Sequence, residues 1–216
     1  MSQQARLAII AGGIGGIGSA VGKSLREQGI ALALLYAPFE ASNVAVVLGE
    51  VYGPGPHEDI DTYECDITDH ESVQRVFDKI VKRNAGFPCI LVNSAGYVNL
   101  TPLEETPPED VLRHYMVNLY GPTLTGQAFA RAYMAAKEGK SETPGGRIVN
   151  LASQAAHVAL DKHAAYCASK AGLIGLTRCQ ANEWGRLGIT ANTVSPGPVW
   201  TALGKKAWGD AAVRQE

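Results

Sequence analysis

The feature that most constrains the fold is a glycine-rich stretch placed directly after a short apolar segment. The segment Leu7 to Ala11 has no polar alternation, which is typical of a buried strand. The stretch Gly12 to Gly18 follows at once, and an apolar helical pattern runs from about Ile17 to Gln28. Glycines at this position let the backbone turn tightly and approach a phosphate group, whose charge the start of a helix stabilises. The pattern predicts a strand, a phosphate-binding turn and a helix in that order.

Segments typical of strands and helices alternate along the remainder of the chain. Strands without polar alternation that are separated by helices indicate a parallel sheet covered on both faces. We therefore expect an α/β fold, a Rossmann-type doubly wound parallel sheet in a single domain over residues 1–216, with ligands at the carboxyl ends of its strands. Further strands are expected at residues 31–36, 60–65, 89–92, 147–151 and 189–194, helices at residues 73–81, 109–136 and 164–185, and surface loops at residues 51–59 and 137–146.

Composition and charge narrow the classes of partner. The formal net charge is -2 and the isoelectric point is near 6.2, which argues against a basic surface for nucleic acid and against a polybasic membrane anchor. No apolar run approaches the length of a membrane span. The four cysteines form no CxxC pair and no metal-ligand spacing with the five histidines. We therefore expect reduced thiols, no metal site and a cytoplasmic protein.

Tyr166 and Lys170 are the residues that indicate chemistry most clearly. They are four residues apart in a predicted helix and therefore lie one turn apart on the same face. An ammonium group beside a phenol favours the phenolate, so the pKa of Tyr166 is expected to fall towards neutrality. Such a group is a general acid/base for reactions at a carbinol or carbonyl carbon. Ser153 lies thirteen residues before the tyrosine, at the end of a predicted strand.

The end of the second predicted strand bears on the choice of cofactor. An acidic residue there would bind the adenosine ribose hydroxyls and favour NAD, whereas its absence admits the extra phosphate of NADP. The strand ends at Tyr36, and no acid follows until Glu40. No lysine or arginine stands between Arg26 and Arg75, so no basic side chain of this stretch would bind that phosphate. The sequence favours NADP, with NAD as the alternative.

The motifs in this order resemble the short-chain dehydrogenase/reductases in their single-domain form, over residues 7 to about 204. The chain departs from the family pattern at Ala11 and Ser94, where threonine and a second asparagine are usual. The matching motifs are Gly12, Gly16 and Gly18, then Asp66, Asn93 to Gly96, Asn118, Ser153, Tyr166 with Lys170, and Pro196 with Gly197.

The resemblance implies a role for each matching residue. Tyr166 would give and take the proton, and Ser153 would hold the substrate oxygen. Lys170 would bind the nicotinamide ribose and lower the pKa of Tyr166, while Asn118 would join the proton relay. Besides Tyr166 and Lys170, the cofactor would contact Gly12, Ile14, Gly16, Ile17, Gly18, Tyr36, Asp66, Ile67, Asn93, Ala95, Gly96, Pro196, Gly197, Val199 and Thr201.

Other interpretations of single residues stay open at this point. Ser153 is also placed to cap a strand end, and Asn118 in a helix can bond the backbone. Asp66 can cap the helix that starts near Asp69. Cys167 is expected to be a small buried residue, and His157 and His163 are interpreted as loop residues on the substrate side.

The stretch from Pro198 to Trp208 resembles polyol and sugar-alcohol dehydrogenases of this family. The implied function is an NADP(H)-preferring oxidoreductase that interconverts a secondary alcohol and a ketone, with a polyol or ketose as substrate. The alternatives are a 3-oxoacyl-thioester or polyketide reductase, which Tyr36-Ala37 resembles, and a non-catalytic dinucleotide-binding module. Since family members continue beyond Glu216, we expect the last helix and strand to be missing, and a homo-oligomer, tetramer or dimer, for the full-length protein.

Overall fold

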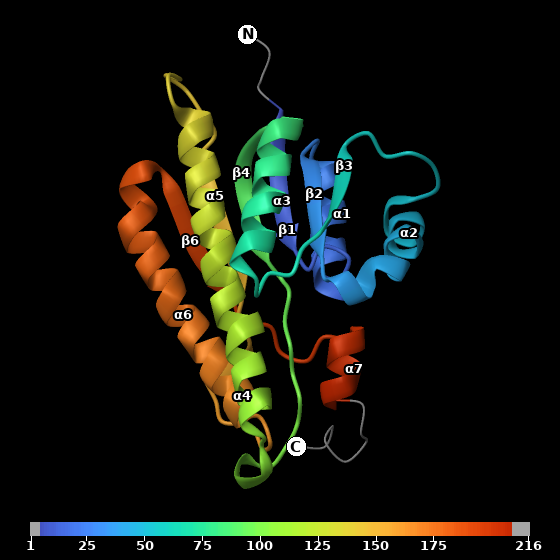
Figure 1. The fold of residues 1–216 in the computed structure, drawn as a ribbon, viewed down its shortest axis with the longest axis vertical. Helices are drawn as coiled ribbons and strands as arrows, with labels where there is room; N and C mark the ends of the chain where they lie inside the picture. The colour runs from blue at the N-terminus through green and yellow to red at the C-terminus, as the bar shows by residue number, and fades with distance from the viewer. Residues whose placement is uncertain (1–4, 209–216) are drawn as a thin grey trace.

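The computed structural model describes residues 5–208, and its centre is a six-stranded parallel sheet (Figure 1). The strand order is β3-β2-β1-β4-β5-β6, so the direction of winding reverses between β1 and β4. This order confirms the predicted doubly wound sheet. The strands are β1 (Arg6–Ala11), β2 (Ala31–Tyr36), β3 (Ile60–Glu64), β4 (Phe87–Asn93), β5 (Gly146–Leu151) and β6 (Ile189–Val194).

Helices cover both faces of the sheet because successive residues of its central strands point to opposite faces and are apolar on both. Ile9 of β1 packs in a core shared with α3 (His70–Arg83) and α5 (Gly121–Lys137). Its neighbour Ile10 packs in the opposite core, beside α1 (Gly16–Glu27). The long helix α6 (Ala164–Trp184) lies next to α5 on the first face, over β6 (Figure 1).

The helix α3 begins and ends at residues suited to those positions. The Asp69 carboxylate accepts a hydrogen bond from the Glu71 amide, and Asn84 ends the helix in the left-handed conformation. The alternative that Asp66 caps this helix is therefore wrong. Its carboxylate instead accepts from the amide of Thr68, within the turn after β3.

The segment from Pro38 to Tyr52 is helical, which the sequence analysis did not predict. It forms η1 (Pro38–Asn43), α2 (Val44–Val47) and η2 (Leu48–Tyr52) in succession. The Glu40 carboxylate accepts a hydrogen bond from the Ala37 amide at its start, 2.9 Å away. At its end the Tyr52 hydroxyl donates to the Ser19 carbonyl, and burial raises the pKa of this phenol to about 12. The predicted loop at residues 51–59 therefore begins within the last turn of a helical segment.

A π-helical turn interrupts the long helix expected at residues 109–136. The stretch divides into α4 (Pro108–Tyr115), η4 (Met116–Tyr120) and α5. Asn118 is at the middle of η4 and is fully buried. Single π-helical turns of this kind are frequent at functional sites.

The remaining elements are short and lie mostly at the carboxyl end of the sheet. None of the helices within residues 5–208 is long and apolar enough to cross a bilayer. A seventh strand is absent from this part of the chain, and residues 209–216 lie outside it. The short elements are η3 (Leu103–Glu105), η5 (Gln154–Ala156), η6 (Gly185–Leu187) and α7 (Ala202–Trp208).

Candidate active site

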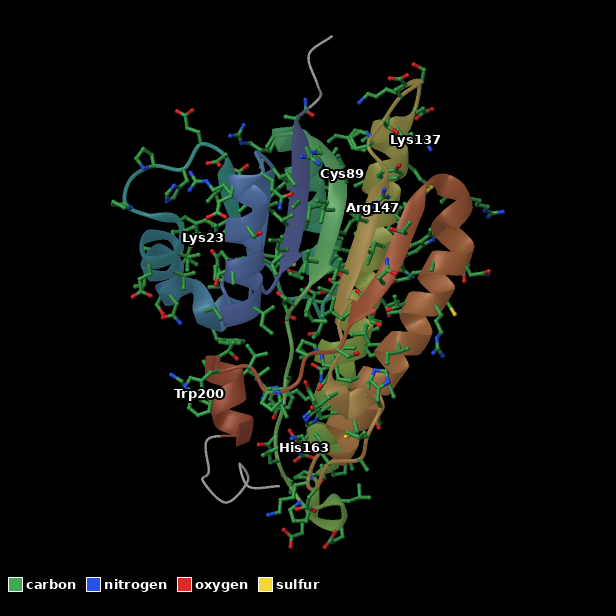
Figure 2. All side chains as sticks on the ribbon, turned by 180° about the vertical axis from the view of Figure 1, so that it is seen from behind. Lys23, Cys89, Lys137, Arg147, His163 and Trp200 are labelled. Carbon is green, nitrogen blue, oxygen red and sulfur yellow. The ribbon has the colours of Figure 1, made fainter. Side chains whose placement is uncertain are left out.

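A cavity lies where the carboxyl ends of the strands meet the start of α6 and the segment after β6. Figure 2 labels His163 and Trp200 at this end of the molecule, whereas Cys89, Lys137 and Arg147 are at the opposite end. Nine residues proposed from the sequence line the cavity, namely Ile17, Gly96, Ser153, Tyr166, Lys170, Pro196, Gly197, Val199 and Thr201.

Tyr166 and Lys170 are brought together on α6, but their electrostatics differ from the expectation. The Lys170 ammonium lies 5.7 Å from the centre of the Tyr166 ring and donates to the Leu151 carbonyl at 2.7 Å. Burial lowers the pKa of Lys170 to about 8. Burial also raises the pKa of Tyr166, and a hydrogen bond with Ser153 only partly opposes this rise. The pKa of Tyr166 is therefore shifted in the direction opposite to the predicted one, because burial is the largest cause of the shift and the contact that opposes it is Ser153 rather than Lys170.

Ser153 caps a short helix and also lines the cavity. It follows β5 directly, and its hydroxyl accepts a hydrogen bond from the Ala155 amide at 3.1 Å, which caps η5. The same side chain lines the cavity and bonds Tyr166. The cap fixes the serine beside the phenol rather than competing with that contact.

Asn118 is held by three hydrogen bonds from its position in η4. Its amide oxygen accepts from the Tyr97 backbone amide at 2.7 Å, and its amide nitrogen donates to the Tyr97 carbonyl at 2.9 Å and to the Ser169 hydroxyl. The interpretation that Asn118 bonds the backbone is thus confirmed. A Cβ atom at Gly96 would be 3.6 Å from the Asn118 oxygen and 3.7 Å from the Lys170 nitrogen, so both side chains approach the same glycine.

The glycine loop fits a dinucleotide phosphate on structural grounds. Gly12 has a φ of +76°, and a Cβ atom there would be 2.6 Å from the Ala95 amide nitrogen. A Cβ atom at Gly18 would overlap the carbonyl oxygen of Gly12, and one at Gly16 would be 2.6 Å from the Thr201 methyl group. No side chain caps the start of α1, so no side chain competes with an anion for its first amide groups. These residues leave the cradle that the pyrophosphate of NAD or NADP needs.

The other proposed cofactor residues lie around the cavity but do not line it. Asn93 is fully engaged in the core, where it donates to Asn150 at 2.8 Å and accepts from Thr125 at 2.7 Å. Ile67 packs against Gly121 at the start of α5. Ala95 packs against Gly12, and Ile14 is buried in the glycine loop. Tyr36 is the last residue of β2, and Asp66 follows the neighbouring strand β3.

Sequence reasoning missed several lining residues that follow strand ends. Ser94 lines the cavity, and its hydroxyl donates to the Ala11 carbonyl at 2.8 Å, which joins the loops after β4 and β1. His163 lies in the loop that directly precedes α6, lines the cavity and is buried beside the Tyr166 ring, which agrees with its interpretation as a loop residue on the substrate side. His157 is exposed and Cys167 is only half-buried. Placement within five residues of the ends of β4 and β5 is the signal that could have found Val98 and Gln154, whereas Ser94 lies inside the Asn93 to Gly96 motif.

Known proteins match the chain over nearly its whole length. A family model described as enoyl-(acyl carrier protein) reductase matches residues 12–216. The chain belongs to the short-chain dehydrogenase/reductase family. This short-chain dehydrogenase/reductase is 38% identical to a D-threitol dehydrogenase of Mycolicibacterium smegmatis, over 95% of this chain and 76% of the relative. It is 36% identical to an NAD-dependent glycerol dehydrogenase of Listeria innocua, over 94% of this chain and 74% of the relative.

A solved structure agrees with these relatives. The structure of an NAD+-bound xylitol dehydrogenase has a TM-score of 0.75 and 30% identity, and covers 89% of this chain and 70% of that one. This short-chain dehydrogenase/reductase is an NAD(P)-dependent oxidoreductase acting on the CH–OH or C=O group. The alternative of a non-catalytic binding module has no support. Within residues 5–208 no cluster of three histidine, cysteine or acidic side chains is arranged to hold a metal ion.

Proposed function

We propose that this enzyme oxidises a polyol to a ketose and reduces the ketose in the reverse direction. The observation that carries the proposal is the set of polar side chains that Ser153, Gln154, His163 and Tyr166 contribute to one cavity. A polyol carries a hydroxyl on every carbon, and each hydroxyl needs a hydrogen-bond partner when it leaves water. The names of the threitol and glycerol dehydrogenases support the same substrate class.

Tyr166 is the proposed acid/base of the reaction. Because burial holds its pKa above the ordinary 10.0, the phenol is protonated at neutral pH and can donate to a carbonyl oxygen held by Ser153. Alcohol oxidation requires the deprotonated form of Tyr166, whose phenolate oxygen accepts the carbinol proton. Lys170 and Asn118, which both approach Gly96, are proposed to hold the nicotinamide ribose and the path of the proton. The bound nicotinamide supplies or accepts the hydride.

A panel of substrates tests the proposed class. We expect oxidation of D-threitol, xylitol and D-arabinitol with measurable kcat/KM, followed by the near-ultraviolet absorbance of the reduced nicotinamide. Acetoacetyl thioesters belong in the panel because they test the second candidate, a 3-oxoacyl-thioester reductase, and the description of the family model concerns acyl carrier protein. Turnover of thioesters with no turnover of polyols or ketoses would replace the proposed substrate class with that candidate.

We propose that the enzyme accepts both dinucleotides and prefers NADPH modestly. No carboxylate side chain is present at Tyr36 or Ala37, where the second strand ends, to repel a 2′-phosphate. The preference should be small because Glu40 keeps a carboxylate at the same turn, bonded to the Ala37 amide. Titration with both reduced cofactors checks this, and Glu40→Gln should raise the affinity for NADPH by about three- to tenfold with little change for NADH. Tighter binding of NADH to the unaltered chain contradicts the proposal.

We also propose that the protein forms a homo-oligomer and is located in the cytoplasm. The helical stretch from α4 to η4 exposes Leu112, Tyr115, Met116 and Tyr120, an apolar surface that a homo-oligomer would cover. All four cysteines are free, as expected for a protein of the reducing cytoplasm.

A further inference from the structure

The segment Tyr97 to Asn99 follows Gly96 in the loop after β4. A set of hydrogen bonds attaches this segment to α4 and η4. Asn118 holds both backbone groups of Tyr97, at 2.7 and 2.9 Å. The backbone amide of Asn99 donates to Nε2 of His114 at 3.1 Å. Val98 stands between these two attachments, is 3% exposed and lines the cavity beside Tyr166. Two side chains of one helical stretch therefore fix one wall of the cavity.

Asp110 binds the side chains of the same segment. Its carboxylate accepts from the Tyr97 hydroxyl at 2.6 Å and from the Asn99 amide nitrogen at 3.0 Å. Burial alone would raise the pKa of Asp110, but these two hydrogen bonds and the nearby His114 and Arg113 side chains together outweigh burial, and the pKa lies below its ordinary value. The carboxylate thus stays charged, and the Arg113 guanidinium lies 4.6 Å from the centre of the Tyr97 ring.

The hydrogen bonds of His114 determine its tautomer. Its Nδ1 atom is 2.7 Å from the Asp110 carbonyl oxygen, which can only accept, so Nδ1 carries the proton. Its Nε2 atom faces the Asn99 backbone amide, which can only donate, so Nε2 is unprotonated. The ring is 1% exposed and neutral in this arrangement. Both partners are backbone atoms, so an amide flip cannot reverse the assignment.

The same ring contacts the proposed acid/base. The centres of the His114 and Tyr166 rings are 6.4 Å apart in an edge-to-face arrangement, and the Tyr97 ring lies 4.8 Å away on another side. His114 therefore touches the tyrosine of the site and, through Asn99, holds the backbone beside Val98. We propose that His114 is a positioning residue that fixes the substrate wall through its Nε2 acceptor. This inference rests on the proposed function of the same cavity.

Two variants separate the acceptor of His114 from its donor. Glutamine can place an oxygen where Nε2 stands and keep the bond from Asn99, whereas asparagine can keep only a donor to the Asp110 carbonyl. We expect His114→Gln to retain kcat/KM for the polyol within about threefold and His114→Asn to lose about ten- to hundredfold, because the buried Asn99 amide is left unpaired. NADPH affinity should stay within about twofold in both, since the ring contacts of His114 are with Tyr97 and Tyr166 rather than with the glycine loop.

Each outcome of this pair of variants decides between positioning and a role in stability alone. Loss of thermal stability in both variants, with kcat/KM per folded molecule unchanged, would show a structural role only and overturn the proposal. Equal losses of kcat/KM in both would refute the claim that the Nε2 acceptor matters.

A nitrogen-15 spectrum of the histidine side chains tests the arrangement without any turnover. The Nδ1-protonated tautomer is expected for His114, and its signal is assigned by its loss in His114→Gln. His163, whose Nδ1 faces the Asp161 carbonyl oxygen, should give a second signal of this kind that remains in the variant. An Nε2-protonated or doubly protonated ring at neutral pH would overturn the inference. If the wild-type chain turns over no polyol, the proposed function fails. The spectrum still tests, independently of turnover, whether His114 holds Asn99 through Nε2.

Discussion

Replacing Tyr166 by phenylalanine should reduce turnover by at least 10²–10⁴-fold while leaving cofactor binding nearly unchanged. Phenylalanine keeps the packing of the ring against His114 and His163 and removes only the hydroxyl. That hydroxyl lines the cavity, is hydrogen-bonded with Ser153 and is the group proposed to exchange a proton with the substrate oxygen. Steady-state rates and a fluorescence titration with NADPH, made on the same preparation, separate the two effects.

Tyr133→Phe is the matched control for this substitution. Tyr133 is also buried, and its hydroxyl donates to the Pro144 carbonyl at 3.1 Å, at the end of the sheet far from the cavity. Its loss should cost about 1 kcal/mol of stability and leave kcat unchanged. Near-normal turnover in Tyr166→Phe would rule out the proposed acid/base, whatever the control does.

Replacing Lys170 by methionine should lower turnover by about 10²-fold or more and at the same time stabilise the fold. The lysine is buried, and burial lowers its pKa from 10.5 to about 8. A difference of that size corresponds to roughly 3 kcal/mol of cost for keeping the charged form in the fold. The substitution also removes the hydrogen bond to the Leu151 carbonyl, which reduces stability by about 1 kcal/mol. The net gain in stability is therefore about 2 kcal/mol. We expect that a lysine kept at that cost is retained for its role in the proposed reaction.

The pH dependence of this gain has a definite sign. Below the folded pKa of about 8, Lys170 is charged in both folded and unfolded states, so the wild type bears the full cost. As the pH rises from about 8 towards 10.5 the folded lysine becomes neutral first, and the cost is relieved. The advantage of Lys170→Met in urea unfolding should therefore be largest at neutral pH and shrink above the pKa. A destabilised variant at neutral pH would contradict the account.

The sequence was sufficient to predict those features that depend on local pattern and chain order. The apolar strand before Gly12 and the strands that follow it predicted the parallel sheet, because buried parallel strands need no polar alternation. The spacing of Tyr166 and Lys170 predicted that they share one face of a helix, and the structure places both in the cavity with Ser153. These inferences needed only periodicity and the rule that ligands bind at the carboxyl ends of parallel strands.

The features that were missed depend on tertiary contacts. At the π-helical turn, both ends of the Asn118 amide group bond the backbone of Tyr97, a contact between residues 21 apart that the local pattern does not reveal. The pKa values of Tyr166 and Lys170 are set by burial, which spacing on a helix does not reveal. The helical segment after β2 depends on Tyr52 packing against α1, a contact between residues 33 apart.

The transfer of deuterium from substrate to cofactor tests the central claim most directly. D-Threitol or xylitol deuterated at the carbinol carbons is mixed with the enzyme and NADP+ or NAD+, and the reduced cofactor is examined by mass spectrometry. The account predicts one deuterium in each molecule of reduced cofactor for each ketose formed, with product formation suppressed in Tyr166→Phe. Reduced cofactor without deuterium, or ketose formed at an undiminished rate by Tyr166→Phe, would contradict it.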